Sequence, residues 1–127
     1  MSAQRRVYIT TPIYYVNDVP HIGHTYTTVV ADALARYHRL RGDTVHFLTG
    51  TDEHGQKMQR AAEARGMTPI ELADEVVENY KSTWPALGIS HDDFIRTTEP
   101  RHKDGVYSLF EAIRKHDPDA LYKGQYE

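Results

Sequence analysis

The fold is decided by two stretches near the start of the chain, VYITTPIYY at residues 7–15 and HIGH at residues 21–24. The first is rich in β-branched and aromatic residues. It predicts a buried strand that ends near Thr10 or Thr11, because Pro12 cannot donate to a sheet ladder. The second places two imidazoles and a glycine at the start of a helix, where free backbone N–H groups and the helix dipole favour a phosphate. Together they predict the opening of a nucleotide-binding βαβ unit.

The same alternation of strand and helix continues beyond the histidines. Apolar residues recur at helical spacing as far as Gly42, which is placed to cap the first helix. A second buried strand at residues 44–49 leads into the polar stretch GTDEHG at residues 50–55. A short helix closes at Gly66, and residues 68–71 form a capping box with proline at the first helical position of the next helix.

Two amphipathic helices and a third strand complete the pattern. The helix opened by the capping box should end or kink at Pro85. Its apolar residues at helical spacing are Leu72, Ala73, Val76, Val77, Tyr80 and Trp84. A strand near residues 93–97 precedes the last helix. On the inner face of that helix we expect Val106, Leu109, Phe110 and Ile113.

This order of elements predicts an α/β fold, the first half of a Rossmann-like doubly wound parallel sheet with flanking helices. We expect three parallel strands, near residues 6–11, 44–49 and 93–97, joined by right-handed crossovers. Ligands of such sheets bind at the carboxyl ends of the strands, where the polar stretch at residues 50–55 lies. A complete sheet of this type usually has two such halves, and the sequence contains one.

The composition fits one globular domain. Hydrophobic residues make up 39% and charged residues 26% of the 127 positions, so the chain can bury a core. Without cysteine it has neither a disulfide framework nor a thiolate metal site. The polar start and the lack of a long apolar run argue against a signal peptide or membrane span, so we expect a cytoplasmic protein. The net charge of −3 gives no strong overall attraction to nucleic acid.

Three segments carry a family resemblance: TTPIYYVN at residues 10–17 leading into HIGH, LTGTDEHG at residues 48–55, and DDFIRTT at residues 92–98. In this order they resemble the N-terminal catalytic region of the bacterial methionyl-tRNA synthetases, which are class I aminoacyl-tRNA synthetases. HIGH alone would indicate only a class I synthetase or a related nucleotidyltransferase, and such a relative is the alternative. The other segments favour the methionine family over its leucine, isoleucine, valine and cysteine relatives.

The resemblance implies a ligase with methionine and ATP as substrates and tRNA as partner. Methionine and ATP give methionyl-adenylate and pyrophosphate, and the methionyl group then passes to the terminal ribose of tRNA. The substrate carboxylate attacks the α-phosphorus, so catalysis rests on positioning and on stabilising charge on the phosphate oxygens. His21 and His24 fit that catalytic role as hydrogen-bond donors, as neutral imidazole or as imidazolium.

The resemblance also assigns binding residues. Ile13 and Tyr15 match residues that line the methionine pocket, and an apolar, aromatic wall suits a thioether. Asp52 is the best candidate partner for the methionine ammonium, because a charge-assisted hydrogen bond is stronger than a neutral one. Gly23 would let the nucleotide approach the backbone closely. The ATP-binding candidates are Thr10, Asn17, His21, Gly23 and His24. No metal ligand is assigned.

Each assignment has an alternative that needs no substrate. The two histidines could simply cap a helix, Asp52 could be the N-cap of the next helix or serve both roles, and the two pocket residues could be core. A rival function is a metallohydrolase that uses His21, His24 and Asp18 or Asp52 as ligands, although this spacing matches no standard metal motif. A third interpretation is a folded but catalytically inactive binding fragment.

The family also has parts that this sequence does not include. They are the Lys-Met-Ser-Lys-Ser loop of the second half-sheet, the cysteine-bearing inserted domain and the helical anticodon-binding domain. We therefore expect residues 1–120 to be the N-terminal half of the catalytic domain and residues 121–127 to be the start of the inserted domain. Mg²⁺ is expected with ATP, whereas zinc would belong only to the absent inserted domain. Complete catalysis by these residues alone is not expected.

Overall fold

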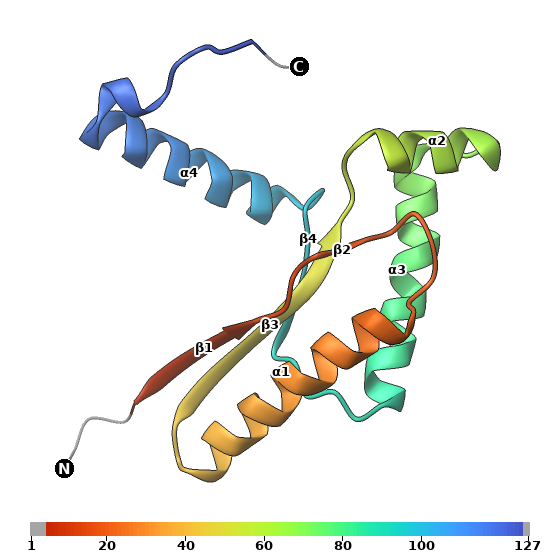
Figure 1. Ribbon diagram of the computed structural model, residues 1–127, viewed down its shortest axis with the longest axis vertical. Coiled ribbons are helices and arrows are strands. Elements are labelled where there is room, and N and C mark those ends of the chain that lie inside the picture. The colour runs from red at the N-terminus through yellow and green to blue at the C-terminus, as the bar shows by residue number, and fades with distance from the viewer. Residues whose placement is uncertain (1–4, 126–127) are drawn as a thin grey trace. The chain divides into compact units, whose positions relative to one another are not determined.

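Strand β3 (Thr44–Asp52) is the centre of a parallel sheet in the computed structural model, which describes residues 5–125 (Figure 1). β1 (Arg6–Thr10) pairs with the first part of β3, and β4 (Asp93–Arg96) pairs with the opposite edge of its later part. β2 (Tyr14–Tyr15) continues the edge begun by β1. The three expected strands and their parallel pairing are confirmed. β3 runs past the expected end at Thr49, because β2 and β4 both pair with its last residues.

The short strand β2 is an element that sequence reasoning missed. Its two residues pair with Thr51 and Asp52 of β3. Pro12 separates β2 from β1 along the same edge, so the pattern indicates a strand followed by a loop. Two residues are also too few to show the alternation that predicts a strand.

The helices begin and end where local signals place them. In chain order the described helices are α1 (Ile22–Leu40), α2 (Gln56–Ala64), α3 (Pro69–Ala86), α4 (Pro100–His116) and the 3₁₀ turn η1 (Pro118–Ala120). The expected capping box starts α3, where Thr68 N–H donates to the Glu71 carboxylate at 2.8 Å. Pro85 lies in the last turn of that helix, as expected. α1 closes at Gly42, whose φ of +84° lets two N–H groups turn back onto the last carbonyls.

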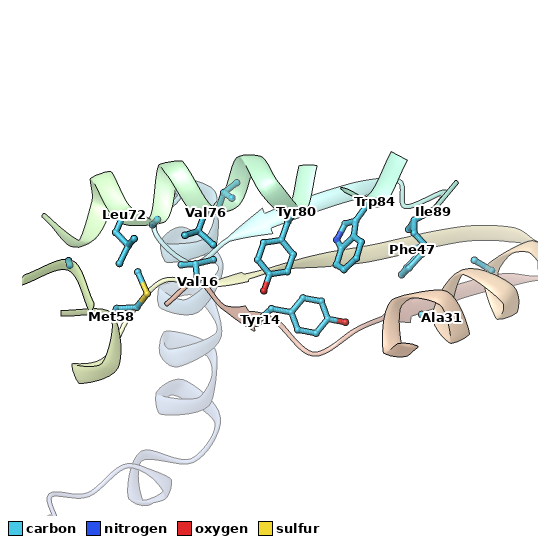
Figure 2. Close-up of a cluster of buried hydrophobic side chains, with 14 residues drawn as sticks. Tyr14, Val16, Ala31, Phe47, Met58, Leu72, Val76, Tyr80, Trp84 and Ile89 are labelled. Atoms are coloured by element: carbon cyan, nitrogen blue, oxygen red, sulfur yellow. The ribbon is translucent and has the colours of Figure 1, made fainter. Parts of the chain in front are cut away.

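One face of α3 supplies much of the core. All six of its expected apolar residues are buried, and Figure 2 shows the labelled ones pointing toward β2 and the residue that follows it. Trp84 and Tyr80 are fully buried there, against Tyr14 of β2. Phe47 of β3 is a second large buried side chain that the sheet contributes to the same cluster, besides Tyr14. The helical spacing therefore predicted this face correctly, because its residues pack in one buried cluster with residues of the sheet.

Helix α1 packs through small and polar residues. Its buried residues are Thr28, Ala31, Asp32 and Ala35, which let the helix lie close to β3. The Asp32 carboxylate accepts hydrogen bonds from the backbone N–H and the hydroxyl of Ser90, both at 2.6 Å, and its other oxygen pairs with Arg36 at 2.5 Å. Burial raises the pKa of Asp32, but the bonds from Ser90 and Arg36 outweigh burial and leave the pKa below its usual value. Asp32 therefore fastens α1 to the loop that precedes β4.

The chain divides into two compact units, one ending at Thr97 and one beginning at Thr98. The second unit contains α4, and the expected inner face of this helix is wrong. Its four apolar residues are exposed, and no residue of α4 is buried. Helical periodicity predicts an apolar side, but it does not identify the surface that would cover that side. Among the described helices, none has the length and apolar character to cross a membrane.

Candidate functional site

A pocket of about 350 Å³ opens between β2 and the start of α1. It collects five of the residues that the sequence assigned to substrate binding or catalysis. These are Ile13, Tyr15, Asn17, His21 and His24, joined by Tyr14, Asp18 and Val19. The pocket lies where β2 ends beside the carboxyl end of β3, which is the edge at which open α/β sheets bind ligands.

His21 and His24 cap the N-terminus of α1 reciprocally. The Gly23 N–H donates to Nδ1 of His21 at 3.1 Å, and the His21 N–H approaches Nδ1 of His24 at 3.4 Å. The two rings stack with their centres 3.7 Å apart. The helix-capping alternative is thus confirmed. The cap uses the two Nδ1 atoms and not the two Nε2 atoms, which can take a further role.

The caps decide which ring nitrogen carries the proton. A backbone N–H can only donate, so Nδ1 of His21 and Nδ1 of His24 are both acceptors and carry no hydrogen. The neutral form of each ring therefore has its proton on Nε2. Burial lowers the pKa of His24, and the charge of a protonated His21 lowers it further, so the neutral form is favoured. The arrangement offers two Nε2–H donors at a helix N-terminus.

Gly23 serves this cap through its missing side chain. A Cβ at this position would lie 3.0 Å from Cε1 and 3.1 Å from Nδ1 of His21, closer than side chains normally pack. The glycine therefore gives the His21 ring room to lie over the end of the helix.

Ile13 and Tyr15 are surface residues and not core, which rules out that alternative. They are 42% and 51% exposed, whereas Tyr14 between them is 6% exposed. Side chains alternate along a strand, so burying Tyr14 in the core turns Tyr15 outward. Thr10, at the end of β1, is exposed and does not line the pocket.

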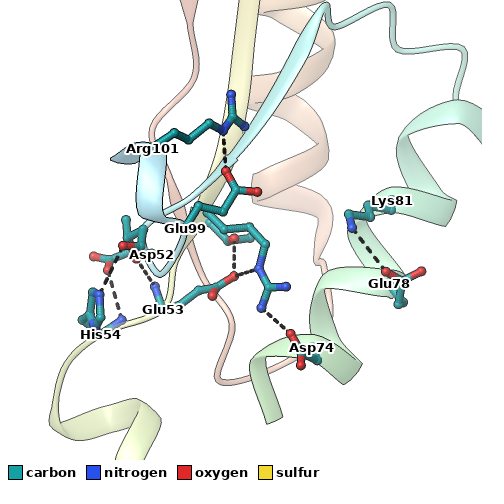
Figure 3. Close-up of polar contacts among 11 residues, drawn as sticks. Asp52, Glu53, His54, Asp74, Glu78, Lys81, Glu99 and Arg101 are labelled. Carbon is teal, nitrogen blue, oxygen red and sulfur yellow. Dashed lines mark hydrogen bonds and ion pairs between the residues drawn. The ribbon is translucent and has the colours of Figure 1, made fainter. Parts of the chain in front are cut away.

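Asp52 is the last residue of β3 and pairs with Tyr15 of β2 in the sheet register. It does not line the pocket itself. Its carboxylate accepts a hydrogen bond from the His54 N–H at 3.3 Å, and Figure 3 shows the two residues together. The N-cap of α2 is Gly55, which makes no side-chain cap, so the alternative that Asp52 caps this helix is wrong.

A buried ion pair next to Asp52 was missed in the sequence. Glu53 is 3% exposed and meets Nε of Arg96 at 2.6 Å, and it also accepts from the Thr51 hydroxyl at 2.9 Å. Arg96 reaches the Asp74 carboxylate of α3 as well, at 2.6 Å. These contacts raise the pKa of Arg96, first through the Glu53 hydrogen bond. They join the residue that follows β3 to β4 and α3. In the sequence Glu53 looks like one more polar loop residue.

The metallohydrolase alternative has no support in the geometry. Within residues 5–125, no group of three or more histidine, aspartate or glutamate side chains is arranged to hold a metal ion. His21 and His24 have stacked rings, with their Nδ1 atoms turned to backbone donors.

The fold and pocket define an α/β protein with half of a Rossmann-like parallel sheet and paired histidines at a helix N-terminus, an arrangement that suits a phosphate group. Comparison with known proteins narrows the class. The family model of class I tRNA synthetases (M) matches residues 7–127. The chain therefore belongs to the class I tRNA synthetases.

Individual relatives are named methionine–tRNA ligases. A methionine–tRNA ligase of Streptomyces coelicolor is 55% identical over 121 residues, which cover 94% of this chain and 22% of the relative. One from Halalkalibacterium halodurans is 55% identical over 124 residues, 98% of this chain and 18% of the relative. The chain thus spans about a fifth of the length of these curated relatives.

The fold has a close counterpart among solved structures. Mycobacterium tuberculosis methionyl-tRNA synthetase in complex with methionyl-adenylate superposes with a TM-score of 0.85 and 41% identity. The superposition covers 88% of this chain and 22% of that one. The expected fold class, half of a Rossmann-like parallel sheet, is confirmed.

Proposed function

We propose that this chain is the N-terminal part of the catalytic domain of a methionine–tRNA ligase. The enzyme would activate methionine with ATP and transfer the methionyl group to tRNA. The observation that carries the proposal is the pair of Nε2–H donors at the start of α1, beside a pocket walled by Ile13 and Tyr15. The similarity to methionine–tRNA ligases over almost the whole chain supports it.

In the first step the nucleophile is the carboxylate of methionine, so the protein's task is to stabilise charge. A carboxylate oxygen of methionine bonds to the α-phosphorus of ATP, the bond from that phosphorus to the bridging oxygen breaks, and pyrophosphate leaves. Negative charge grows on the phosphate oxygens in the transition state. His21 and His24 would donate their Nε2–H groups to those oxygens, and the cap holds both rings in place before the reaction.

The remaining site residues take binding roles in this proposal. Ile13 and Tyr15 would contact the methionine side chain, and Asp52 would pair with its ammonium group from the adjacent strand end. Thr10, Asn17 and Gly23 would face the nucleotide. Mg²⁺ would come with ATP and bind its phosphate oxygens.

We also propose the wider setting. Residues 1–120 would form the N-terminal half of the catalytic domain and residues 121–127 the start of the inserted domain, of which residues 126 and 127 lie outside the described part. Zinc would belong to that inserted domain. The enzyme would work in the cytoplasm, where its tRNA partner is found, and without a membrane partner.

The test is methionine-dependent exchange of radiolabelled pyrophosphate into ATP by the full-length enzyme that contains this chain. We expect exchange with methionine and far slower exchange with leucine, isoleucine, valine or cysteine. Exchange with one of those amino acids as fast as with methionine would overturn the methionine assignment. Lack of exchange with every amino acid would favour the inactive binding protein instead.

A further inference from the structure

His24 has a buried partner far away in the sequence, Tyr80 of α3. The Tyr80 hydroxyl lies 3.0 Å from Nδ1 of His24, across 56 positions of sequence. Tyr80 is fully buried, whereas His24 is partly exposed at the pocket. The contact therefore joins the core to a histidine of the candidate site.

The direction of this hydrogen bond follows from the second donor at the same atom. The His21 N–H also points at Nδ1 of His24, and it can only donate. Nδ1 therefore carries no proton, and the Tyr80 hydroxyl must be the donor. Burial raises the pKa of Tyr80 to about 12, with smaller contributions from Tyr14 and Asp18, so the hydroxyl keeps its proton in neutral solution.

The Tyr80 ring is held in a fixed place by other aromatic rings. It stacks on Tyr14 with ring centres 5.8 Å apart and an angle of 10°, and the edge of Trp84 packs at 5.5 Å. The Tyr14 ring also lies 4.6 Å from the His24 ring. The His24 backbone is fixed separately, because its carbonyl accepts from the Thr28 hydroxyl at 2.9 Å. Donor and acceptor are thus both preorganised.

We propose that Tyr80 is a positioning residue for His24, whose ring it holds in the Nε2–H tautomer by donating a hydrogen bond to Nδ1. The ring proton is then on Nε2, which can donate it to a phosphate oxygen. The catalytic consequence rests on the proposed function. The tautomer and the hydrogen bond do not, and they can be measured without any substrate.

The first measurement is a ¹H–¹⁵N correlation spectrum of the histidine rings in the chain, followed across pH. In the unchanged chain we expect a single His24 tautomer with Nδ1 unprotonated and Nε2 protonated. In Tyr80→Phe, which keeps the ring, the lost donor should allow a tautomer mixture and raise the pKa of His24 toward its ordinary value. The titratable groups that face His24 from its neighbouring elements are His21, Tyr14, Asp18 and Tyr80 itself.

Two comparisons keep this test decisive. Tyr26→Phe removes an exposed hydroxyl from the same helix as His24 and should leave both the tautomer and the pKa unchanged. If Tyr80→Phe did not fold, a fluorinated tyrosine at position 80, a stronger donor of nearly the same size, should lower the pKa of His24 further. A His24 ring with its proton on Nδ1 in the unchanged chain, or an unaltered spectrum in Tyr80→Phe, would overturn the proposal.

The second measurement is adenylate formation in the full-length enzyme. Tyr80→Phe should slow this step about tenfold, the lower end of the effect usual for residues that orient a functional group, with KM values for ATP and methionine nearly unchanged. An unchanged rate despite a mixed tautomer would show that the hydrogen bond has no catalytic consequence. If even the unaltered enzyme formed no adenylate, the proposed function would fail, and the spectrum would still decide what Tyr80 does to His24.

Discussion

Replacing Asp32 by alanine should destabilise the fold strongly although Asp32 lies outside the pocket. The carboxylate accepts two hydrogen bonds from Ser90, each at 2.6 Å. Hydrogen bonds to a charged group contribute about 1.5–3 kcal/mol each, and the two share one oxygen, so their effects are not additive. The pair with Arg36 adds at most about 0.5 kcal/mol, because the Arg36 side chain is half exposed. We expect a loss of about 3 kcal/mol in the free energy of unfolding.

Urea unfolding of the chain checks this magnitude. With an m-value near 1.5 kcal/mol per M, about 3 kcal/mol lowers the midpoint by about 2 M. The matched control is Arg36→Met, which removes the exposed ion pair and the hydrogen bond from Arg36 to the Gly88 carbonyl and keeps both bonds from Ser90. It should lower the free energy of unfolding by less than about 1 kcal/mol. Equal losses in the two variants would refute the reasoning, because the surface pair and not the Ser90 contact would then hold α1.

The same carboxylate should give a pH dependence of known sign. Its pKa in the folded protein lies below the usual value, so its stabilising effect is present above the unfolded pKa of about 3.9. That effect is lost as the pH falls through the folded pKa. The difference in stability between the unchanged chain and Asp32→Ala should therefore be constant near neutrality and shrink below about pH 4.

Three further predictions concern activity. In the full-length enzyme, Asp52→Ala should weaken the binding of methionine much more than the binding of ATP. The loss should be about 2–5 kcal/mol if the pair with the ammonium is buried. Equal losses for the two substrates in pyrophosphate exchange would contradict the assignment. His21→Ala and His24→Ala should each slow adenylate formation by roughly 10²–10³ and should be non-additive, as measured by rapid quench. Loss of ATP affinity at an unchanged forward rate would show that the histidines serve ground-state binding instead. The 127 residues alone should show at most a trace of adenylate formation in the same assay, and full activity would show that no second half-sheet is needed.

Features set by near neighbours in sequence were predictable. The capping box at Thr68, the glycine end of α1 and the buried face of α3 follow from short patterns, because each depends on residues within a few turns. The pairing of β1, β3 and β4 joins distant segments, but it was predictable for another reason. Alternating β and α segments restrict the possible topologies.

Features set by distant residues were not predictable in this way. The bond from Tyr80 to His24 depends on how α3 crosses the start of α1, and in the sequence Tyr80 is one more apolar position of its helix. Burial of Glu53 depends likewise on Arg96, which arrives on another strand. The apolar side of α4 shows the converse error, because periodicity marks a side but not its partner.

The central place of β3 also bears on how the chain is made. β1 and β3 emerge from the ribosome before β4, which follows α2 and α3 in the chain. During that interval one edge of β3 offers unpaired backbone groups, and such edges recruit strands from other chains. Parallel pairing between distant segments is also slow to form. A pause in translation after β3 has emerged and before β4 has done so would lengthen the interval and favour aggregation over folding.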